Sequence, residues 1–530
     1  MAGDPFLSDP SKKRKRSNKV TSTTRTKKSK STTPQPSTTT SQYDEEISSA
    51  SDTENEQSVE DQRQEEELSS DEEFATESAA DKRRRLAKQY LENLKNEELR
   101  DSEDFDAQDL DDEILAKRLQ VDVADAKGHV YKFWGDKISQ QLDGDEIKLT
   151  TTRIGSKNVT SMCIHFPYLY TVSKDVEIIK WNINSGKNPQ RIKHTKGGSK
   201  YFTLNTTQPG LNHHWEQINC IAASPDGKYI VTGGSDSRLI IWSSENLACL
   251  KVLPTRSAVN SIVFRRNTDQ LFAACADLRV RTYSINQFTQ LETLYGHQDN
   301  ITDIASLARE TCVSVGSRDK TAMFWKIPEE SRLTFRGGDS VEKKRKKKSD
   351  EDEEIGNDEP FHSEGSIDVV SMIDESHFVT GSDNGNIALW SLAKKKAQNT
   401  KRLAHGLQPQ FQPQQASAEL ATNVASRQIP APQPHWITAI HAPAYSDIFF
   451  SGSFGGTIKI WKLDSTLRTF TLIGEVENLR GFVVKIDSVE ILDTKQLKVF
   501  VLVSKEHKFG RWFGKVPGGR NALISFTFSI

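Results

Sequence analysis

The sequence predicts an all-β protein built as a seven-bladed β-propeller, preceded by a disordered N-terminal region and two α-helices. Three observations predict it. A turn residue followed six positions later by an aromatic residue recurs seven times between residues 175 and 512. Short apolar segments of strand length flank these turns. Each unit has an apolar face that it cannot cover alone, and radial stacking into a closed ring covers all of these faces.

The closing aromatics set the register of the units. The pairs are Asp175 and Trp181, Asp236 and Trp242, Asp277 and Tyr283, Asp319 and Trp325, Asn384 and Trp390, Gly455 and Trp461, and Glu506 and Trp512. Seven closures predict seven blades over residues 147–530. Two segments, 147–153 and 524–530, are both suited to be the outermost strand that closes the ring, and the sequence leaves the choice open.

Residues 1–80 lack the apolar surface that a packed core needs, so we expect them to be disordered. Residues 1–40 carry ten Lys and Arg against two Asp, whereas residues 41–80 carry fifteen Asp and Glu against one Arg. The net charge of -2 hides this division. The basic run Lys12, Lys13, Arg14, Lys15 and Arg16, followed by further lysines at 27, 28 and 30, has the spacing of a two-part nuclear import signal. A solvated basic tail is the alternative.

Residues 81–128 are predicted to form two amphipathic helices. Leu86, Tyr90 and Leu94 recur at helical spacing in the first, and Leu115, Leu119 and Val123 in the second. Such faces need a partner surface. The helices could pack on the propeller or on another protein, and the sequence does not decide between these.

The distances between closing aromatics predict three insertions. They are 61, 41, 42, 65, 71 and 51 residues, while a bare blade needs about 40 to 45. The excess lies near residues 182–212, 339–360 and 391–434. All three segments are polar and contain Lys and Arg, so we expect loops or disordered excursions instead of core.

Nothing in the sequence points to an enzyme, a metal or a cofactor. The five cysteines are far apart and no Cys/His cluster has metal-ligand spacing. Motifs for a nucleophile elbow, a phosphate loop or a zinc protease are absent. The chain has no apolar run of membrane-spanning length and a polar, basic N-terminus, so we expect a protein that is neither secreted nor membrane-spanning.

Cationic residues recur in the turns between strands and predict an RNA-binding surface, because guanidinium and ammonium groups suit phosphate contact. The alternative for each residue is a solvated surface charge with no binding role. The densest group is the stretch SKEHKFGRW near the C-terminus. The predicted RNA-binding residues are Lys505, His507, Lys508, Arg511, Arg318, Lys320, Arg279 and Arg281.

The segments GHQDNITDI with SRDKTAMFW and SPDGKYIVTGGSDSRLIIW resemble the WD-repeat family. The resemblance implies a buried hydrogen-bonded set of His, Ser or Thr, Asp and Trp in each complete blade. The second blade has His214, Thr232, Asp236 and Trp242. The fourth has His297, Asp319 and Trp325, with Val315 where the hydroxyl is expected. For the fifth, the candidates are His362, Thr380, Asn384 and Trp390.

Three further motifs resemble the U3-55K or Rrp9 family of the U3 small nucleolar ribonucleoprotein. They are WKIPEESRLTFRGG, RRLAKQYLENLK and EHKFGRW. The resemblance implies a nucleolar, non-enzymatic scaffold that binds the box B/C region of U3 snoRNA beside a kink-turn-binding protein. It also implies partners among other box C/D ribonucleoprotein and small-subunit processome proteins, in 18S rRNA maturation. The alternative is a nuclear adaptor of the chromatin or ubiquitin-ligase type that reads a peptide in the central channel and is indifferent to RNA.

Overall fold

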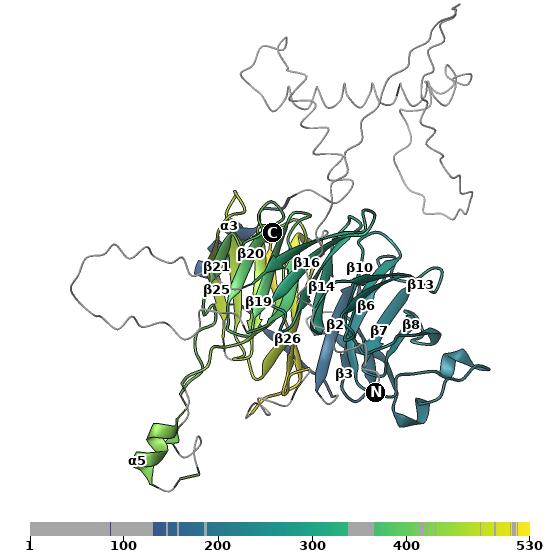
Figure 1. The fold of residues 1–530 in the computed structure, drawn as a ribbon, viewed down its shortest axis with the longest axis horizontal. Coiled ribbons are helices and arrows are strands. Elements are labelled where there is room, and N and C mark those ends of the chain that lie inside the picture. Colours follow the sequence, from purple (N-terminus) through teal and green to yellow (C-terminus); the bar gives the residue numbers. More distant parts are fainter. Residues whose placement is uncertain are drawn as a thin grey trace, which may run out of the picture. The chain divides into compact units, whose positions relative to one another are not determined.

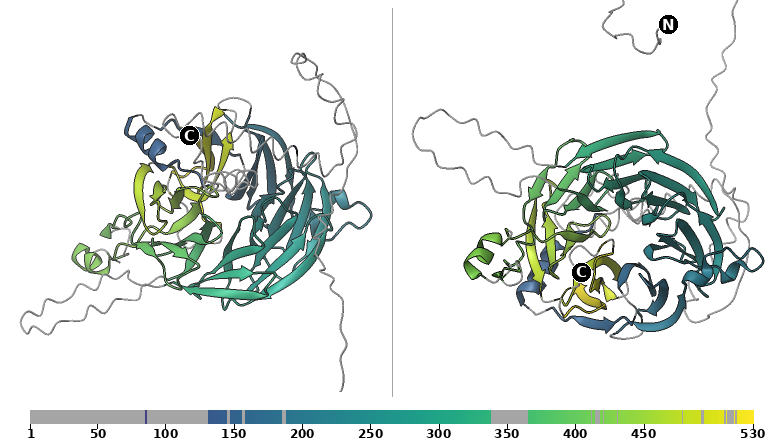
Figure 2. Two further views of the ribbon diagram at one scale, coloured as in Figure 1. Left: turned by 90° about the horizontal axis from the view of Figure 1, so that it is seen from above. Right: turned by 60° about the horizontal axis from the view of Figure 1, so that its bottom comes forward.

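Seven four-stranded antiparallel sheets stand side by side around a central axis (Figures 1 and 2). The computed structural model describes Arg85 and residues 131–530, with gaps at 145–146, 156–157, 185–187, 338–364, 411, 414–417, 420, 430, 478, 492–493, 509, 511–515 and 517. The predicted all-β propeller is therefore confirmed. The predicted helices over 81–128, the predicted import signal and the predicted insertion at 339–360 lie outside the described residues, apart from the helical Arg85.

The first four sheets follow the chain in order, each from an inner strand to an outer one. Sheet 1 contains β2 (Val159–His165), β3 (Tyr168–Ser173), β4 (Glu177–Asn182) and β5 (Gln190–Lys196). Sheet 2 contains β6 (Ile218–Ala223), β7 (Tyr229–Gly234), β8 (Arg238–Ser243) and β9 (Cys249–Pro254). Sheet 3 contains β10 (Val259–Phe264), β11 (Gln270–Cys275), β12 (Arg279–Ser284) and β13 (Thr289–Tyr295). Sheet 4 contains β14 (Ile301–Ser306), β15 (Thr311–Gly316), β16 (Thr321–Lys326) and β17 (Ser331–Arg336).

The remaining sheets complete the ring. Sheet 5 contains β18 (Ile367–Met372), β19 (His377–Ser382), β20 (Ile387–Ser391) and β21 (Asn399–Lys401). Sheet 6 contains β22 (Ile437–His441), β23 (Ile448–Ser453), β24 (Ile458–Leu463) and β25 (Phe470–Val476). Sheet 7 contains β26 (Phe482–Ile491), β27 (Gln496–Ser504), β28 (Ala522–Ser529) and, outermost, β1 (Thr150–Arg153).

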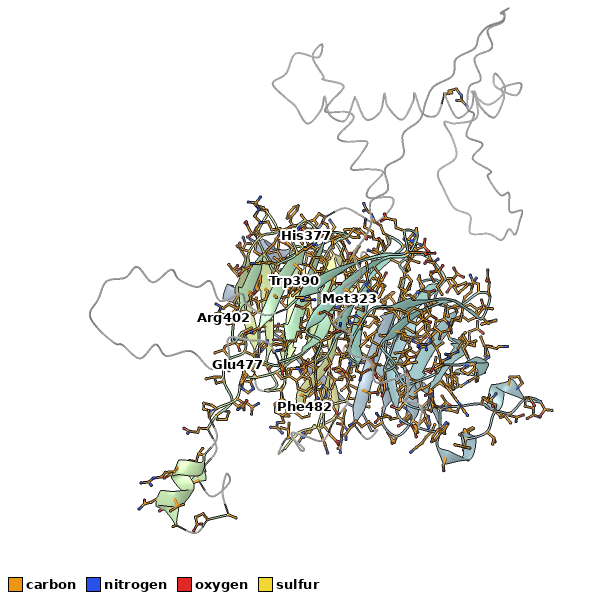
Figure 3. The ribbon with its side chains drawn as sticks, viewed as in Figure 1. Met323, His377, Trp390, Arg402, Glu477 and Phe482 are labelled. Atoms are coloured by element: carbon orange, nitrogen blue, oxygen red, sulfur yellow. The ribbon has the colours of Figure 1, made fainter. Side chains whose placement is uncertain are left out.

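The core lies between the sheets. Seven clusters of buried apolar side chains each join two neighbouring sheets, so every seam of the ring has one. Between sheets 4 and 5, for example, Phe335 packs edge-on against Phe378 with ring centroids 5.3 Å apart. Trp390, which is labelled in Figure 3, stacks on Phe378. Burial at these seams supplies the main driving force for closing the ring.

A register shift marks each of the seven inner strands at the same place, next to the pair at its start. The extra residue often turns its side chain to the next sheet. Thr160 donates to the carbonyl of Ile218 at 2.6 Å, Asn219 to that of Val259 at 3.0 Å, and Asn260 to that of Ile301 at 2.7 Å. These bonds fix neighbouring sheets in register where they approach the axis.

The question of ring closure is answered by sheet 7. β28 pairs with β27 on one side and with β1 on the other, so residues 150–153 form the outermost strand. A helix that the sequence analysis did not anticipate, α3 (Gly135–Gly144), precedes β1. The Asp447 carboxylate accepts hydrogen bonds from the backbone N–H groups of Trp134 and Gly135 at the start of this helix. Trp134 and Ile138 pack into the core between sheets 6 and 7.

Two of the predicted insertions contain ordered structure. Residues 190–196, expected in a loop, form the outer strand β5, and the excursion itself contains the short 3₁₀ turns η1 (Ser199–Tyr201) and η2 (Pro209–Leu211). The insertion at 391–434 begins with β21 and carries α5 (Thr422–Ala425) and η3 (Ser426–Gln428), which lie away from the sheets (Figure 1). The polar composition concealed β5 because an outer edge strand needs little apolar surface.

The predicted seventh closure is wrong in its position. The third strand of sheet 7 is β28, not a strand that ends at Trp512, and residues 505–521 are a long connection between β27 and β28. Glycines and Pro517 interrupt this connection, whereas residues 522–529 alternate as a strand should. Within the described part of the chain, no helix has the length and apolar character needed to cross a membrane.

Candidate nucleic-acid interface

One face of the ring, here called the turn face, is formed by the connections between the second and third strands of the sheets. Because every sheet runs outward from its inner strand in the same way, these connections all reach the same end of the ring. They include the turn aspartates and the predicted residues Lys505, His507, Lys508, Arg318 and Lys320, whereas the predicted Arg279 and Arg281 lie on β12. The turn face is therefore where that prediction is examined.

Sheet 2 holds a buried polar network at this face, formed by the four predicted side chains. The two ring nitrogens of His214 lie 2.9 Å from Asp236 Oδ2 and 2.7 Å from Thr232 Oγ1. Trp242 Nε1 donates to the same threonine hydroxyl at 2.8 Å. Every polar group in the set has a partner, which is the condition for such a network to stabilise a fold.

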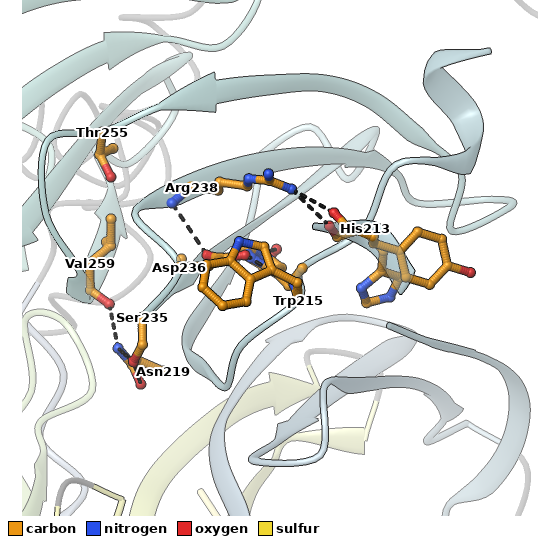
Figure 4. Close-up of polar contacts among 12 residues, drawn as sticks. His213, Trp215, Asn219, Ser235, Asp236, Arg238, Thr255 and Val259 are labelled. Carbon is orange, nitrogen blue, oxygen red and sulfur yellow. Dashed lines mark hydrogen bonds and ion pairs between the residues drawn. The ribbon is translucent and has the colours of Figure 1, made fainter. Parts of the chain in front are cut away.

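The excursion at residues 197–214 rests on this network. The guanidinium of Arg238 donates to the backbone carbonyls of Tyr201, at 3.0 Å, and of Phe202. Its backbone N–H donates to Asp236 (Figure 4). Arg238 is thus occupied in holding the excursion, which reduces its capacity to contact a phosphate.

Sheet 4 has the same network with a different hydroxyl. Ser314 Oγ lies 2.7 Å from His297 Nε2 and accepts from Trp325 Nε1 at 2.8 Å, while Asp319 lies 2.8 Å from His297 Nδ1. The expectation that Val315 occupies the hydroxyl position is wrong. The turn in sheet 4 is one residue longer than that in sheet 2, which moves the hydroxyl back by one position.

Sheets 5 and 6 use other residues. In sheet 5, Trp390 donates to Thr380 at 2.8 Å, and Asp383, next to the predicted Asn384, accepts from the backbone of Gly365 and Ser366. The predicted His362 lies outside the described residues.

In sheet 6, His405 supplies the histidine, which the sequence analysis missed. Its ring nitrogens lie 2.7 Å from Thr457 Oγ1 and 2.8 Å from Ser451 Oγ. Burial lowers the pKa of His405 to about 3, so the ring is neutral. His405 lies inside the predicted insertion, 46 residues before Ser451. Unlike the histidine of GHQDN, His405 has alanine before it, so the Gly-His pair that marks the histidine of sheet 4 is absent here.

The predicted cluster in SKEHKFGRW is only partly exposed. Lys505 is exposed, but His507 is buried against Trp436 with ring centroids 4.2 Å apart, and burial lowers the pKa of His507 to about 3. Lys174 donates to the His507 carbonyl at 2.8 Å and pairs with the buried Glu506. His507 is therefore a neutral, structural side chain, which corrects its assignment as a cationic RNA contact. Arg511 lies outside the described residues.

Lys508 is half-buried. Burial lowers the pKa of its ammonium, while the charges of Asp303 and Asp368 act in the opposite direction. These two acids lie on β14 and β18, the inner strands of sheets 4 and 5. Lys508 is therefore less available to a phosphate than a fully exposed lysine.

Two cations that the sequence analysis missed join Lys505. Arg520 donates its backbone N–H to the carbonyl of Arg480 at 2.8 Å, and the Lys505 carbonyl accepts from Val516 at 3.1 Å. Arg480, Lys505 and Arg520 are all exposed, and among the described residues none of them takes part in an ion pair. We call these three residues the cationic rim. Arg480 and Arg520 were missed because each stands alone in the sequence, and only the fold brings them to Lys505.

The other predicted cations occupy two turns. Arg318 and Lys320 flank Asp319 in sheet 4; Arg318 is exposed and Lys320 is half-buried, and the backbone N–H of Arg318 donates to Asp299 at 3.0 Å. In sheet 3, Arg279 stacks on Tyr295 with its guanidinium 4.8 Å from the ring centroid. The side chain of Arg281 is only 3% exposed and pairs with Asp277 through both terminal nitrogens. Arg281 is therefore not an exposed RNA contact.

The His, Cys, Asp and Glu side chains of the described residues show whether they could hold a metal ion. No group of three or more His, Cys, Asp or Glu side chains among them could hold a metal ion. All five cysteines are buried, unpaired thiols. His214, His297 and His405 are engaged in the hydrogen bonds given above, so these histidines hold sheets together.

Comparison with known proteins agrees with the repeat. The family described as "WD domain, G-beta repeat" matches residues 205–243, 288–326 and 427–462. Ribosomal RNA-processing protein 9 of Saccharomyces cerevisiae is 45% identical over 520 residues, spanning 85% of this chain and 89% of the yeast protein. The chain belongs to the U3-55K/Rrp9 family of WD-repeat proteins. U3 small nucleolar RNA-interacting protein 2 of Homo sapiens, another relative, is 30% identical over 84% of this chain and 82% of its own length.

Solved structures of the U3-55K/Rrp9 family have the same ring. "Structure of U3-55K" matches with a TM-score of 0.56 at 28% identity, over 71% of this chain and 98% of that one. "Crystal structure of RRP9 WD40 repeats" matches with a TM-score of 0.57 at 27% identity, over 72% of this chain and all of that one. The shared part corresponds in extent to the propeller.

Proposed function

We propose that this protein is a non-enzymatic scaffold subunit of the U3 small nucleolar ribonucleoprotein, acting in pre-rRNA processing in the nucleolus. It binds the box B/C region of U3 snoRNA together with a kink-turn-binding protein and joins the small-subunit processome for 18S rRNA maturation. The names of its relatives, Ribosomal RNA-processing protein 9 and U3 small nucleolar RNA-interacting protein 2, support this role. So does the use of its network histidines in structural bonds.

The observation that carries RNA binding is the cationic rim. Lys505 and Arg520 lie in the connection between β27 and β28, Arg480 lies in the connection from β25 to β26, and all three are exposed. The backbone hydrogen bond from Arg520 to Arg480 joins the two connections. Guanidinium groups without an acidic partner are suited to phosphate oxygens, and their contacts with RNA weaken as salt rises. Contacts of this kind are individually weak, so a partner protein that shapes the RNA first would raise the affinity of the whole assembly.

A peptide-reading adaptor is the alternative. The names of the relatives, Ribosomal RNA-processing protein 9 and U3 small nucleolar RNA-interacting protein 2, refer to RNA and favour the RNA scaffold.

The test is a triple charge reversal, Arg480→Glu with Lys505→Glu and Arg520→Glu, in the full chain. We expect binding to a U3 box B/C RNA carrying the kink-turn-binding protein to weaken at least tenfold, with an unchanged Tm. The slope of log Kd against log salt should fall by about two, as expected for the loss of three phosphate contacts. The matched control reverses three exposed cations elsewhere, Lys193, Lys251 and Arg468. Equal losses in both variants would refute a specific rim.

The predicted import signal is a separate part of this proposal. Deleting residues 1–40 is expected to reduce nuclear accumulation of a fluorescent fusion without changing the Tm. Full nuclear entry of the deleted form would reject the import interpretation of Lys12 to Arg16.

A further inference from the structure

Sheet 3 departs from the network that sheets 2 and 4 share. His214 and His297 each stand four residues before the first residue of the inner strand, and Thr255 occupies that position in sheet 3. The closing aromatic is Tyr283, whose hydroxyl is buried without a hydrogen-bond partner among the described residues. Sheet 3 therefore lacks both the histidine and the hydroxyl group that is its partner in sheets 2 and 4.

A small pocket lies between the outer parts of sheets 2 and 3. It has a volume of about 220 Å³ and is lined by Pro254, Arg256, Arg279, Arg281, Gln290, Thr293 and Tyr295. Three of these residues are arginines and none is acidic. The single nearby carboxylate is Asp277, which pairs with Arg281.

The charge at the pocket is therefore unbalanced. Three guanidinium groups against one carboxylate leave a net charge of +2. Asp277 is held by Arg281, and the charge of Arg279 also lowers the pKa of Asp277, so Arg279 lies close to this pair. Arg256 is exposed, and neither it nor Arg279 has an ion-pair partner within the described part of the chain. The guanidinium groups of Arg256 and Arg279 are therefore left to pair with an incoming oxyanion.

The surroundings distinguish a protein ligand from RNA. One face of Tyr295 is covered by the Arg279 guanidinium, 4.8 Å from the ring centroid, and the side chain is 59% exposed. Leu278 and Leu291, which flank the pocket on the turn and on β13, are 37% and 46% exposed. A polypeptide covers exposed leucines on binding, whereas a sugar-phosphate backbone does not.

We propose that the pocket lined by Arg256, Arg279 and Arg281 receives an acidic side chain from a segment of a partner protein, with apolar neighbours that cover Leu278 and Leu291. The acidic group is a carboxylate or a phosphate ester, which the guanidinium groups recognise in the same bidentate way. This site is separate from the cationic rim and does not depend on the proposed RNA binding.

The experiment measures fluorescence anisotropy of labelled decapeptides on the full chain. One peptide alternates Glu and Leu, a second has phosphoserine in place of Glu, and a third has Gln in place of Glu. We expect the two acidic peptides to bind and the Gln peptide to bind at least tenfold more weakly. Stronger binding of the phosphoserine peptide than of the Glu peptide identifies a phosphate ester as the preferred group, and the reverse order identifies a carboxylate.

Two variants make the test decisive. Arg256→Glu with Arg279→Glu leaves the Arg281 and Asp277 pair intact and should weaken binding of both acidic peptides at least tenfold, with an unchanged Tm. The control, Lys193→Glu with Lys251→Glu, changes the net charge equally on neighbouring outer strands and should stay within twofold. Equal effects of the two variants on peptide binding would overturn the site. The site would also be overturned if the Arg256/Arg279 variant lost binding of an oligouridylate but bound the acidic peptides unchanged.

Discussion

Sheets 2 and 3 stand next to each other and solve the same packing problem differently. In sheet 2, His214 links Asp236 to Thr232 and Trp242, and every polar group is satisfied. In sheet 3 the histidine is absent, Arg281 pairs with the turn aspartate, and the Tyr283 hydroxyl has no partner among the described residues. The difference shows that the ring tolerates the loss of one network when an ion pair and apolar packing replace it. A pocket in the outer part of sheet 3 is lined with arginines.

The largest effect should come from breaking the complete network. His214→Ala leaves Asp236 and Thr232 buried without their partner, so we expect a loss of about 3 kcal/mol in the free energy of unfolding. Urea denaturation of the propeller measures it. His194→Ala, at an exposed position on β5, is the control and should change stability by less than about 0.5 kcal/mol. A small effect at His214 would mean that apolar packing alone holds sheet 2.

A smaller loss in the free energy of unfolding is expected from breaking the ion pair that replaces the network in sheet 3. Arg281→Met keeps most of the side-chain volume but leaves Asp277 without its cation, and Asp277 is 21% exposed, so the expected loss is about 2 kcal/mol at pH 7.

The pH dependence of this loss has a defined direction. Burial of Asp277 tends to raise its pKa, but the hydrogen bonds and charge of Arg281 outweigh burial and hold the pKa below its ordinary value. The stabilisation is therefore complete above the ordinary pKa of about 4 and is lost as the pH falls through the folded value. Denaturation of both proteins between pH 7 and pH 2.5 should show the difference shrinking. A constant difference would assign the loss to packing.

The smallest effect has the opposite sign. Tyr283→Phe removes a buried hydroxyl that has no partner among the described residues, so we expect stability to rise by up to about 1 kcal/mol. Tyr170→Phe is the matched control, because the Tyr170 hydroxyl is bonded to Ser244 at 2.8 Å and its removal should cost about 1 kcal/mol. Destabilisation by Tyr283→Phe would show that this hydroxyl is satisfied in solution.

Most of the ring could be predicted because its signals are local. A turn residue and an aromatic six positions apart define a hairpin, and six of the seven closures were placed correctly. The seventh was misplaced because its second and third strands are separated by the 505–521 connection, which contains the repeat-like residues Glu506 and Trp512.

The site was harder to predict because it depends on contacts between distant residues. Arg480 and Arg520 are unremarkable in sequence and meet Lys505 only through the pairing of β26, β27 and β28. Conversely, His507 and Arg281 look like surface cations in sequence, but the fold buries both of them. Burial of a charged residue in a turn cannot be inferred from hydrophobic periodicity, which reports only the apolar positions.

The pairing of β1 with β28 has a consequence for synthesis on the ribosome. Sheet 7 takes its outermost strand from residues 150–153 and its third strand from residues 522–529, so six sheets are translated between these two partners. During that interval the apolar faces at the still-open seam between sheets 1 and 7 have nothing to cover them, and such surfaces bind chaperones or aggregate. A ribosome that stalls before residue 522 would release a nearly complete ring that cannot close, which makes translation of the last strand the step that commits the chain to its native state.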